Sequence, residues 1–494
     1  MARWTLTVPL DSQSPTPRFV QIARALAEDV RRGRLRPGEP LPGSRALAVS
    51  LGVHRNTVLA AYQELEAQGW IVTTPGLGTF VAETAPEDAS AAPSVQVAPD
   101  VGFVMPPAVE TRALPRGPAA PRGMLSLLTG SPDVRLLPSE VLARAYRRAL
   151  KRGGQRLLDY AAPLGHAGLR EALAGMLASL RGMAVTADTL LITRGSQGAL
   201  DLAARTLLRP GDTVAVESPG YLPAWDAFRL TGANVVPVPV DSEGLRVDVL
   251  EQLGAVRAVY LTPHHQYPTT VTLSAERRQR LLAWARASRV ALIEDDYDHE
   301  FHFDGPPVLP LASQDRDGLV LYVGTLSKVL APGLRLGFLA APAPFITRAA
   351  SVRAAVDRQG DGVTEAAVAE LLEEGEVQRH VRKMRSVYRS RRDALVDALR
   401  ASLNSTLDFT VPAGGMTLWA RCAPGVDAAR WTERGLREGV GFMHGGHYTF
   451  DRAPLNALRL CFTSLQEDEL REAVRRMARA LEGMLTDRGR DGGQ

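Results

Sequence analysis

The chain has 494 residues, 45% of them hydrophobic and 23% charged, a composition typical of globular proteins and enough for about three domains. No apolar run approaches the length of a membrane span, and two cysteines are too few for a disulfide framework or a thiolate metal site. The start of the chain has neither the charged region nor the apolar core of a secretory signal, so we expect a cytoplasmic protein with no membrane partner.

The net charge of +4 is unevenly distributed along the chain. Residues 1–82 hold nine arginines and six acidic residues, a net charge of +3. A small basic segment of this kind can bind a polyanion. Residues 83–123, rich in proline and alanine, then predict an extended linker to a second domain over residues 124–487.

The first domain predicts three helices and a hairpin. Helical periodicity covers residues 19–31, Ser44 is expected to cap a second helix, and Gly52 makes a tight turn before a third helix over residues 54–70. Two short strands within residues 71–81 add a wing to this helix-turn-helix spacing. The residues expected to face inward are Ile22, Ala25, Leu26, Val30, Val58, Tyr62 and Leu65.

The start of the third helix carries side chains that can read bases or hold phosphates. His54, Arg55, Asn56 and Thr57 occupy its first turn. A surface helix start that Asn56 merely caps is the alternative for this tetrapeptide alone. The stretch "PLPGSRALAVSLGVHRNTVLAAYQELEAQGWIVTTPGLGTFV" resembles the winged helix-turn-helix of the GntR family. That resemblance implies DNA contacts at Arg45, Arg55, Thr57, Gly76 and Gly78.

The chain contains only three lysines, and one lies where an amine could act chemically. Lys151 and Lys383 stand beside arginines on expected helix surfaces, where a solvated charge explains them. Lys328 follows an apolar strand over residues 319–323, in "GTLSKVLAPGLRLGF". A partly buried lysine can lose its proton near neutral pH, unlike arginine, and its neutral amine can attack a carbonyl. Lys328 is therefore the catalytic candidate.

A second strand, over residues 290–293, runs directly into the acidic residues 294–296. Open α/β sheets bind ligands at the carboxyl ends of their strands. The alternative is a solvated strand end with helix-capping carboxylates. Together with Lys328 the acidic run predicts pyridoxal phosphate, which needs a lysine for covalent attachment and a carboxylate at the pyridine nitrogen. Asp295 is the candidate carboxylate, and Tyr297 could contact the ring hydroxyl.

The cofactor phosphate needs hydrogen-bond donors. A strand over residues 190–193, a turn of small residues and a helix predict an anion site at the helix N-terminus. Hydroxyls and a cation near Lys328 could add to it. The candidate phosphate ligands are Gly195, Ser196, Gln197, Thr325, Ser327 and Arg335.

Three further features bear on the site. Tyr221 could stack on the cofactor ring. The pairs His264–His265 and His444–His447 raise the question of a metal, but no third ligand accompanies either pair at helical or hairpin spacing, so we expect loop histidines and no metal. Arg459 lies on an apolar strand, where a substrate or effector carboxylate is a natural partner and a structural ion pair is the alternative.

These segments, in this order, resemble fold type I aminotransferases over most of residues 124–485. The resemblance implies a large domain with a mostly parallel sheet and a smaller C-terminal domain, with Lys328 binding the cofactor covalently. It also implies the roles given above for Asp295, Tyr297, Tyr221, Thr325, Arg335 and Arg459. One motif departs from the family.

The family's "NPTG" asparagine has no counterpart in this chain. "HHQYPTT" places Gln266 and Tyr267 before the proline and Thr270 where glycine is usual. His265 and Gln266 are the candidates for the missing ring contact.

A winged helix tethered to such a domain resembles the MocR-type (GabR-like) transcriptional regulators. The resemblance implies a homodimer that binds a double-stranded DNA operator. We hypothesise that a small amino compound displaces Lys328 from pyridoxal phosphate, forming an external aldimine, and so changes DNA binding. Two alternatives remain: a working aminotransferase of an amino acid, and a sensor for which the cofactor itself is the signal.

Overall fold

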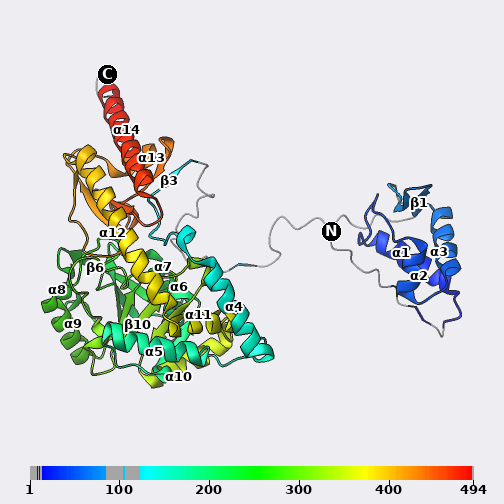
Figure 1. Ribbon diagram of the computed structural model, residues 1–494, viewed down its shortest axis with the longest axis horizontal. Coiled ribbons are helices and arrows are strands. Elements are labelled where there is room, and N and C mark those ends of the chain that lie inside the picture. Colours follow the sequence, from blue (N-terminus) through cyan, green and yellow to red (C-terminus); the bar gives the residue numbers. More distant parts are fainter. Residues whose placement is uncertain (1–7, 9, 12–13, 85–103, 106–122, 492–494) are drawn as a thin grey trace. The chain divides into compact units, whose positions relative to one another are not determined.

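The computed structural model describes residues 8, 10–11, 14–84, 104–105 and 123–491. It divides into two compact units, residues 1–107 and 108–494, each of which is described by itself (Figure 1). Most of the expected linker, residues 83–123, lies outside the described residues.

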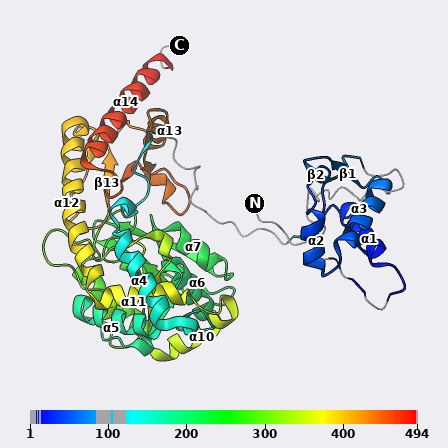
Figure 2. The same cartoon turned by 45° about the vertical axis from the view of Figure 1, so that its right-hand side comes forward.

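The N-terminal unit is a three-helix bundle with an antiparallel hairpin (Figure 2). Its elements are α1 (Arg18–Arg31), α2 (Ser44–Leu51), α3 (Arg55–Ala67), β1 (Ile71–Thr74) and β2 (Gly78–Val81). Of the residues expected to face inward, Ile22, Leu26, Val58, Tyr62 and Leu65 are buried, whereas Ala25 and Val30 are half-buried. Apolar periodicity therefore identified part of the core of this unit, which also contains residues such as Leu47 and Trp70.

Two helix starts differ from the sequence prediction. Gly43, not Ser44, is the N-cap of α2, because Ser44 has already entered the helix. At α3 the ring of His54 caps the helix by accepting from the Asn56 amide N, at 3.3 Å. Asn56 itself is therefore inside the first turn, with an exposed side chain. Gly52 makes the expected turn with φ +63°, a left-handed conformation that glycine adopts without strain.

The C-terminal unit is built on an eight-stranded sheet of order β4-β11-β10-β9-β8-β5-β6-β7. Its pairs are parallel except at β11 and β7, which run antiparallel to their neighbours. The strands are β4 (Leu190–Thr193), β5 (Thr213–Ser218), β6 (Asn234–Asp241), β7 (Gly244–Leu245), β8 (Ala258–Leu261), β9 (Ala291–Asp296), β10 (Val320–Thr325) and β11 (Gly337–Ala340).

Both faces of this sheet are covered, because successive side chains of each strand point to opposite faces. On β5, Val214 and Val216 pack in one hydrophobic cluster and Ala215 in another. Helices lie on either side of the strands in Figure 1. They are α4 (Ser139–Gly153), α5 (Ala167–Arg181), α6 (Gly195–Leu207), α7 (Leu222–Arg229), α8 (Val247–Leu250), α9 (Ala275–Ser288), α10 (Ala343–Val356) and α11 (Gly362–Glu373).

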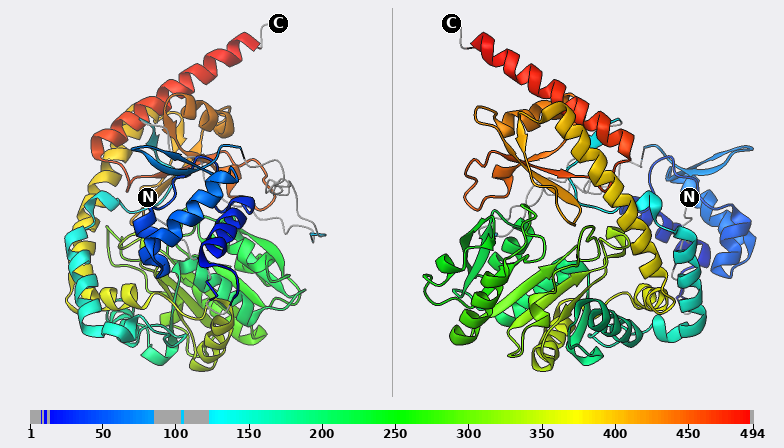
Figure 3. Two further views of the ribbon diagram at one scale, coloured as in Figure 1. Left: turned by 90° about the vertical axis from the view of Figure 1, so that its right-hand side faces the viewer. Right: turned by 60° about the vertical axis from the view of Figure 1, so that its left-hand side comes forward.

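A smaller antiparallel sheet follows, of order β12-β13-β16-β15, with helices packed on it (Figure 3). Its strands are β12 (Leu407–Asp408), β13 (Thr417–Cys422), β15 (Met443–His444) and β16 (Ala457–Cys461); β14 (Val440–Gly441) pairs with β3 (Leu125–Ser126). The helices are α12 (Glu376–Leu403), α13 (Ala428–Arg437) and α14 (Glu467–Asp491). In Figures 1 and 2, α12 runs from α11 in the large half to α14 in the small half. No described helix is both long and apolar enough to cross a bilayer.

Candidate functional site

A cavity lies at the carboxyl ends of the parallel strands, where ligands bind in open α/β sheets. Six of the residues singled out in the sequence line it: Ser196, Tyr221, Asp295, Tyr297, Lys328 and Arg459. The other lining residues are Gly130, Tyr260, Thr262, Tyr267 and Met416. The fold therefore brings together segments separated by more than three hundred residues.

Lys328 follows β10 by three residues and is half-buried at the edge of the cavity. Its Nζ donates to the Gly130 carbonyl O at 2.6 Å. Burial lowers the pKa of Lys328, and the guanidinium of Arg459 lowers it further. Both effects raise the fraction of neutral amine, the form that attacks a carbonyl carbon.

The three acidic side chains at the end of β9 point to different faces of the sheet, because successive side chains of a strand alternate. Asp295 faces the cavity, whereas Glu294 accepts from the backbone amides of Leu311 and Ala312 at 2.8 and 2.9 Å. Asp296 accepts from the Tyr322 hydroxyl at 2.7 Å. Only one of the three carboxylates is thus offered to a ligand in the cavity.

Asp295 is buried, and one of its two carboxylate oxygens accepts a hydrogen bond. Tyr260 donates its hydroxyl to Oδ2 at 2.9 Å, while Oδ1 has no hydrogen-bond partner among the described residues. Burial raises the pKa of Asp295 to about 7. A buried, unpaired acceptor is costly, and a protonated pyridine nitrogen would supply the missing donor.

The start of α6, whose Ser196 lines the cavity, lies beside a cation. Gly195 opens α6 with φ +70°, and a Cβ on Gly195 would lie 3.1 Å from Nη2 of Arg335. Arg335 donates to the Arg194 carbonyl O at 3.0 Å. Ser327 Oγ is buried without a partner in the described part of the chain. Helix amides, a guanidinium and an unpaired hydroxyl suit a phosphate.

The remaining phosphate candidates are partly engaged elsewhere. Thr325 Oγ1 donates to the Leu336 carbonyl O at 3.2 Å and accepts from the Ser327 amide N at 3.1 Å. Gln197 donates its side-chain amide to the Pro223 carbonyl O at 2.8 Å. The backbone amide of Gln197 is still in the first turn of α6, where amides lack intrahelical acceptors.

His265 and Gln266 are engaged away from the cavity. His265 Nδ1 lies 2.8 Å from Asp298 Oδ1. Gln266 donates to the carbonyls of Pro219 and Tyr267 at 2.9 and 2.7 Å and accepts from the Thr269 hydroxyl at 2.6 Å. Thr270 keeps a glycine-like φ of +64°. Neither candidate for the missing ring contact is therefore placed to make it.

Tyr267 is the residue of this loop that lines the cavity, and sequence reasoning missed it. Its ring centroid lies 5.1 Å from that of Tyr221, and the guanidinium of Arg459 lies 4.6 Å above it. Tyr297 also lines the cavity and donates its hydroxyl to the His265 carbonyl O at 3.0 Å. Tyr260 was missed as well. It lies near the carboxyl end of β8, where ligand-binding residues are expected, and this position could have indicated it.

Arg459 lies on β16 and is buried at the cavity wall. Nη1 donates to the Leu128 carbonyl O at 3.1 Å, and Nε has no hydrogen-bond partner among the described residues. No carboxylate of the described chain forms an ion pair with it, so the structural ion pair considered as an alternative is not found there. A buried guanidinium without a counter-ion suits a ligand carboxylate.

The candidate DNA contacts lie on the N-terminal unit. Arg45, His54, Arg55 and Asn56 are exposed at the starts of α2 and α3, and Thr57 is half-buried. Arg55 Nε donates to Ser44 Oγ at 3.3 Å, which links the two helix starts. Gly76 and Gly78 are exposed in the β1–β2 turn with φ +80° and +127°. An exposed helix start beside a wing is the geometry of groove recognition.

Asp295 makes a testable contribution to the pH dependence of stability. The unfolded chain loses the Asp295 proton above about pH 4 and the folded chain only near pH 7, so the cofactor-free fold loses stability as pH rises through this window. At about 1.4 kcal/mol per unit of pKa difference, the effect is a few kcal/mol. We expect Asp295→Asn to flatten this loss, measured by chemical unfolding at about pH 5 and about pH 8.

The exposed Asp408→Asn is the matched control, and it should leave the pH profile unchanged. Glu217 and Glu294, whose pKa values burial also raises to about 7, contribute the same sign in every variant. Equal pH profiles for wild type and Asp295→Asn would contradict the assignment.

Comparisons with known proteins agree with both units. Residues 19–81 match the family described as "Bacterial regulatory proteins, gntR family", and residues 123–477 match "Aminotransferase class I and II". The chain is 30% identical to the probable rhizopine catabolism regulatory protein MocR of Rhizobium meliloti, covering 94% of each. It is 34% identical to the transcriptional regulator TauR of Rhodobacter capsulatus, covering 93% of this chain and 96% of TauR.

A solved structure extends the comparison to a bound cofactor derivative. LysN, the α-aminoadipate aminotransferase of Thermus thermophilus complexed with N-(5'-phosphopyridoxyl)-L-leucine, is 33% identical, with a TM-score of 0.69. The match covers 74% of this chain and 94% of LysN. The chain belongs to the MocR-type branch of the GntR family, DNA-binding transcriptional regulators whose aminotransferase class I and II domain binds pyridoxal phosphate.

Proposed function

We propose that this regulator senses an amino compound carrying a carboxylate, and that binding in the cavity changes its affinity for an operator. The observation that carries the proposal is the buried Arg459, which has no carboxylate partner in the described chain and shares the cavity with Lys328. An amine facing Lys328 and a carboxylate facing Arg459 are the two ends of an amino acid or a longer amino acid analogue.

Each residue of the cavity has a separate task in this proposal. Pyridoxal phosphate supplies an electrophilic carbon and an electron-withdrawing ring. Lys328 would hold the cofactor covalently, and the unpaired Oδ1 of Asp295 would accept a hydrogen bond from its ring nitrogen. Tyr221 would cover one face of the ring, while the start of α6 and Arg335 would bind the phosphate.

The regulator acts, in the proposal, as a cytoplasmic homodimer that binds repeated half-sites of double-stranded DNA. Leu158 and Tyr160, which are 72% and 74% exposed in the single chain, support a partner surface on the large domain. A change of the dimer on ligand binding would alter how the two winged helices reach their half-sites.

Replacing Arg459 tests the proposal. The operator affinity of the full-length, cofactor-bound protein would be titrated with amino acids and with the corresponding amines that lack the carboxylate. We expect only the carboxylated compounds to shift it, and Arg459→Met to require at least about 10-fold more of them. Arg421→Met, an exposed arginine on the neighbouring strand β13, is the control.

Three outcomes of this titration would contradict the proposal or redirect it. Equal responses to amines with and without a carboxylate would remove the role of Arg459. A response to cofactor addition alone would make the cofactor the signal. DNA binding that no amino compound changes would leave no support for sensing.

Catalytic amino transfer is the second candidate, favoured by the lowered pKa of Lys328 beside a cavity open to amino compounds. Its test is steady-state turnover of an amino donor with a keto acid. Turnover at ordinary enzyme rates, on the order of 10 per second, would favour an enzyme, whereas a single half-reaction would favour a sensor.

A further inference from the structure

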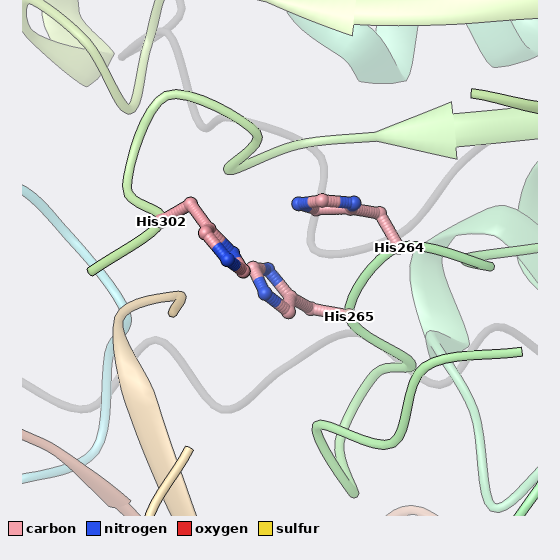
Figure 4. Close-up of side chains that lie close together, drawn as sticks. All are labelled: His264, His265 and His302. Atoms are coloured by element: carbon pink, nitrogen blue, oxygen red, sulfur yellow. The ribbon is translucent and has the colours of Figure 1, made fainter. Parts of the chain in front are cut away.

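Four histidines lie close together at the carboxyl ends of β8 and β9. His264 and His265 follow β8, and His299 and His302 follow β9. Figure 4 shows the rings of His264, His265 and His302 turned toward one another from two separate loops. The ring centroids of His264 and His265 lie 4.2 Å apart, and those of His264 and His299 lie 4.6 Å apart.

The geometry of three of these rings suits a shared ligand. One nitrogen from each of His264, His265 and His302 lies within 4.8 Å of the others. The residues are only 4%, 5% and 8% exposed, respectively. Among the described residues, neither ring nitrogen of His264 or of His302 has a hydrogen-bond partner. Buried polar atoms without partners are rare in native proteins and indicate a missing ion or water.

Two of the histidine rings lie within hydrogen-bond distance of a carboxylate. Asp298 Oδ1 lies 2.8 Å from His265 Nδ1, which leaves Nε2 of that ring for another partner. Asp296 Oδ2 lies 3.0 Å from His299 Nδ1. Carboxylate–histidine pairs orient the imidazoles that bind metals and raise their basicity.

The sequence shows no third histidine at helical or hairpin spacing from His264 and His265, but the fold brings His302 beside them. His302 is 37 positions from His265 in the chain, and the parallel pairing of β8 with β9 brings their carboxyl ends together. Spacing along the chain cannot show a ligand set made from two neighbouring strand ends.

We propose that His264, His265 and His302 bind one divalent transition-metal ion of the zinc class. Imidazole is a preferred ligand of such ions, and three imidazoles leave a position for water or for His299, the next ring of the cluster. The site is distinct from the cofactor cavity, which Asp295 faces while Asp296 and Asp298 face the histidines.

The ion would lie at a contact within the C-terminal unit, between the part that contains the eight-stranded sheet and the part that contains the four-stranded sheet. His302 forms an isolated β-bridge with Gly414, and a Cβ on Gly414 would come within 2.9 Å of His265 Nε2. Met416, two residues further on, lines the cofactor cavity. Tyr297, which also lines it, donates to the backbone of His265. A bound ion would therefore stabilise the contact between His302 and Gly414, next to the cofactor site.

Cobalt binding is the experiment. Full-length protein without a histidine tag, loaded with cofactor and cleared of free cofactor and metal, would be titrated with Co²⁺, whose visible d–d bands lie to the red of the cofactor absorbance. We expect one ion per chain, displaced by Zn²⁺. His302→Gln should weaken binding at least about 100-fold, and Asp298→Asn, which removes only the orienting carboxylate, about 10- to 100-fold.

His444→Gln, a histidine outside the cluster, is the matched control and should bind like wild type. Wild-type protein that binds no Co²⁺ or Zn²⁺ would overturn the proposal even if the histidine variants failed to fold. So would a folded His302→Gln protein that binds the ion as tightly as wild type, because the ion would then be held elsewhere.

Discussion

Lys328→Ala is expected to abolish covalent attachment of the cofactor. Lys328 is the lysine that lines the cavity, with its amine 2.6 Å from the Gly130 carbonyl O and its pKa lowered by burial. Wild-type protein reduced with borohydride should carry the cofactor on Lys328, located by peptide mass analysis. The variant should carry none and should lose the visible absorbance of the attached cofactor, together with any response of DNA binding to amino compounds.

The chain supplies its own controls for this experiment. Lys151 on α4 and Lys383 on α12 are exposed, and alanine at either should leave the cofactor spectrum unchanged. Cofactor trapped on Lys151 or Lys383, or undiminished attachment in Lys328→Ala, would contradict the assignment. Operator binding by Lys328→Ala without amine would separate a sensing defect from loss of the fold.

Arg55→Ala is expected to weaken operator binding by about 10- to 100-fold, since a good base contact contributes about 1–3 kcal/mol. Arg55 is exposed at the start of α3, beside Ser44 of α2. If Arg55 reads a base, the loss should be larger on the operator than on unrelated DNA. If it holds a phosphate, binding to the operator and to unrelated DNA should weaken equally. The slope of log affinity against log salt concentration should then fall by about one.

The matched control is Arg24→Ala, which removes the same charge from an exposed position on α1. Affinities should be measured over a range of salt concentrations with competitor DNA present. An equal loss in Arg24→Ala and Arg55→Ala would mean that overall charge, and not the helix start, determines binding.

Local patterns in the sequence were sufficient for much of the fold and for singling out Lys328, which lines the cavity. The strand over residues 190–193 was predicted with the bounds that the structure gives, because short apolar runs between turn residues are strong local signals. Lys328 stood out because the chain otherwise uses arginine, and Arg459 because a guanidinium within an apolar strand needs a partner. Such signals depend only on neighbouring residues.

Tertiary structure alone decided which side chains share a site. The order of the strands places Tyr260 of β8 against Asp295 of β9 and turns Tyr267, instead of His265 or Gln266, into the cavity. The same pairing brings His302 to His265. These contacts join residues that are far apart in sequence, and they depend on strand order and on competing hydrogen bonds, which local spacing does not contain.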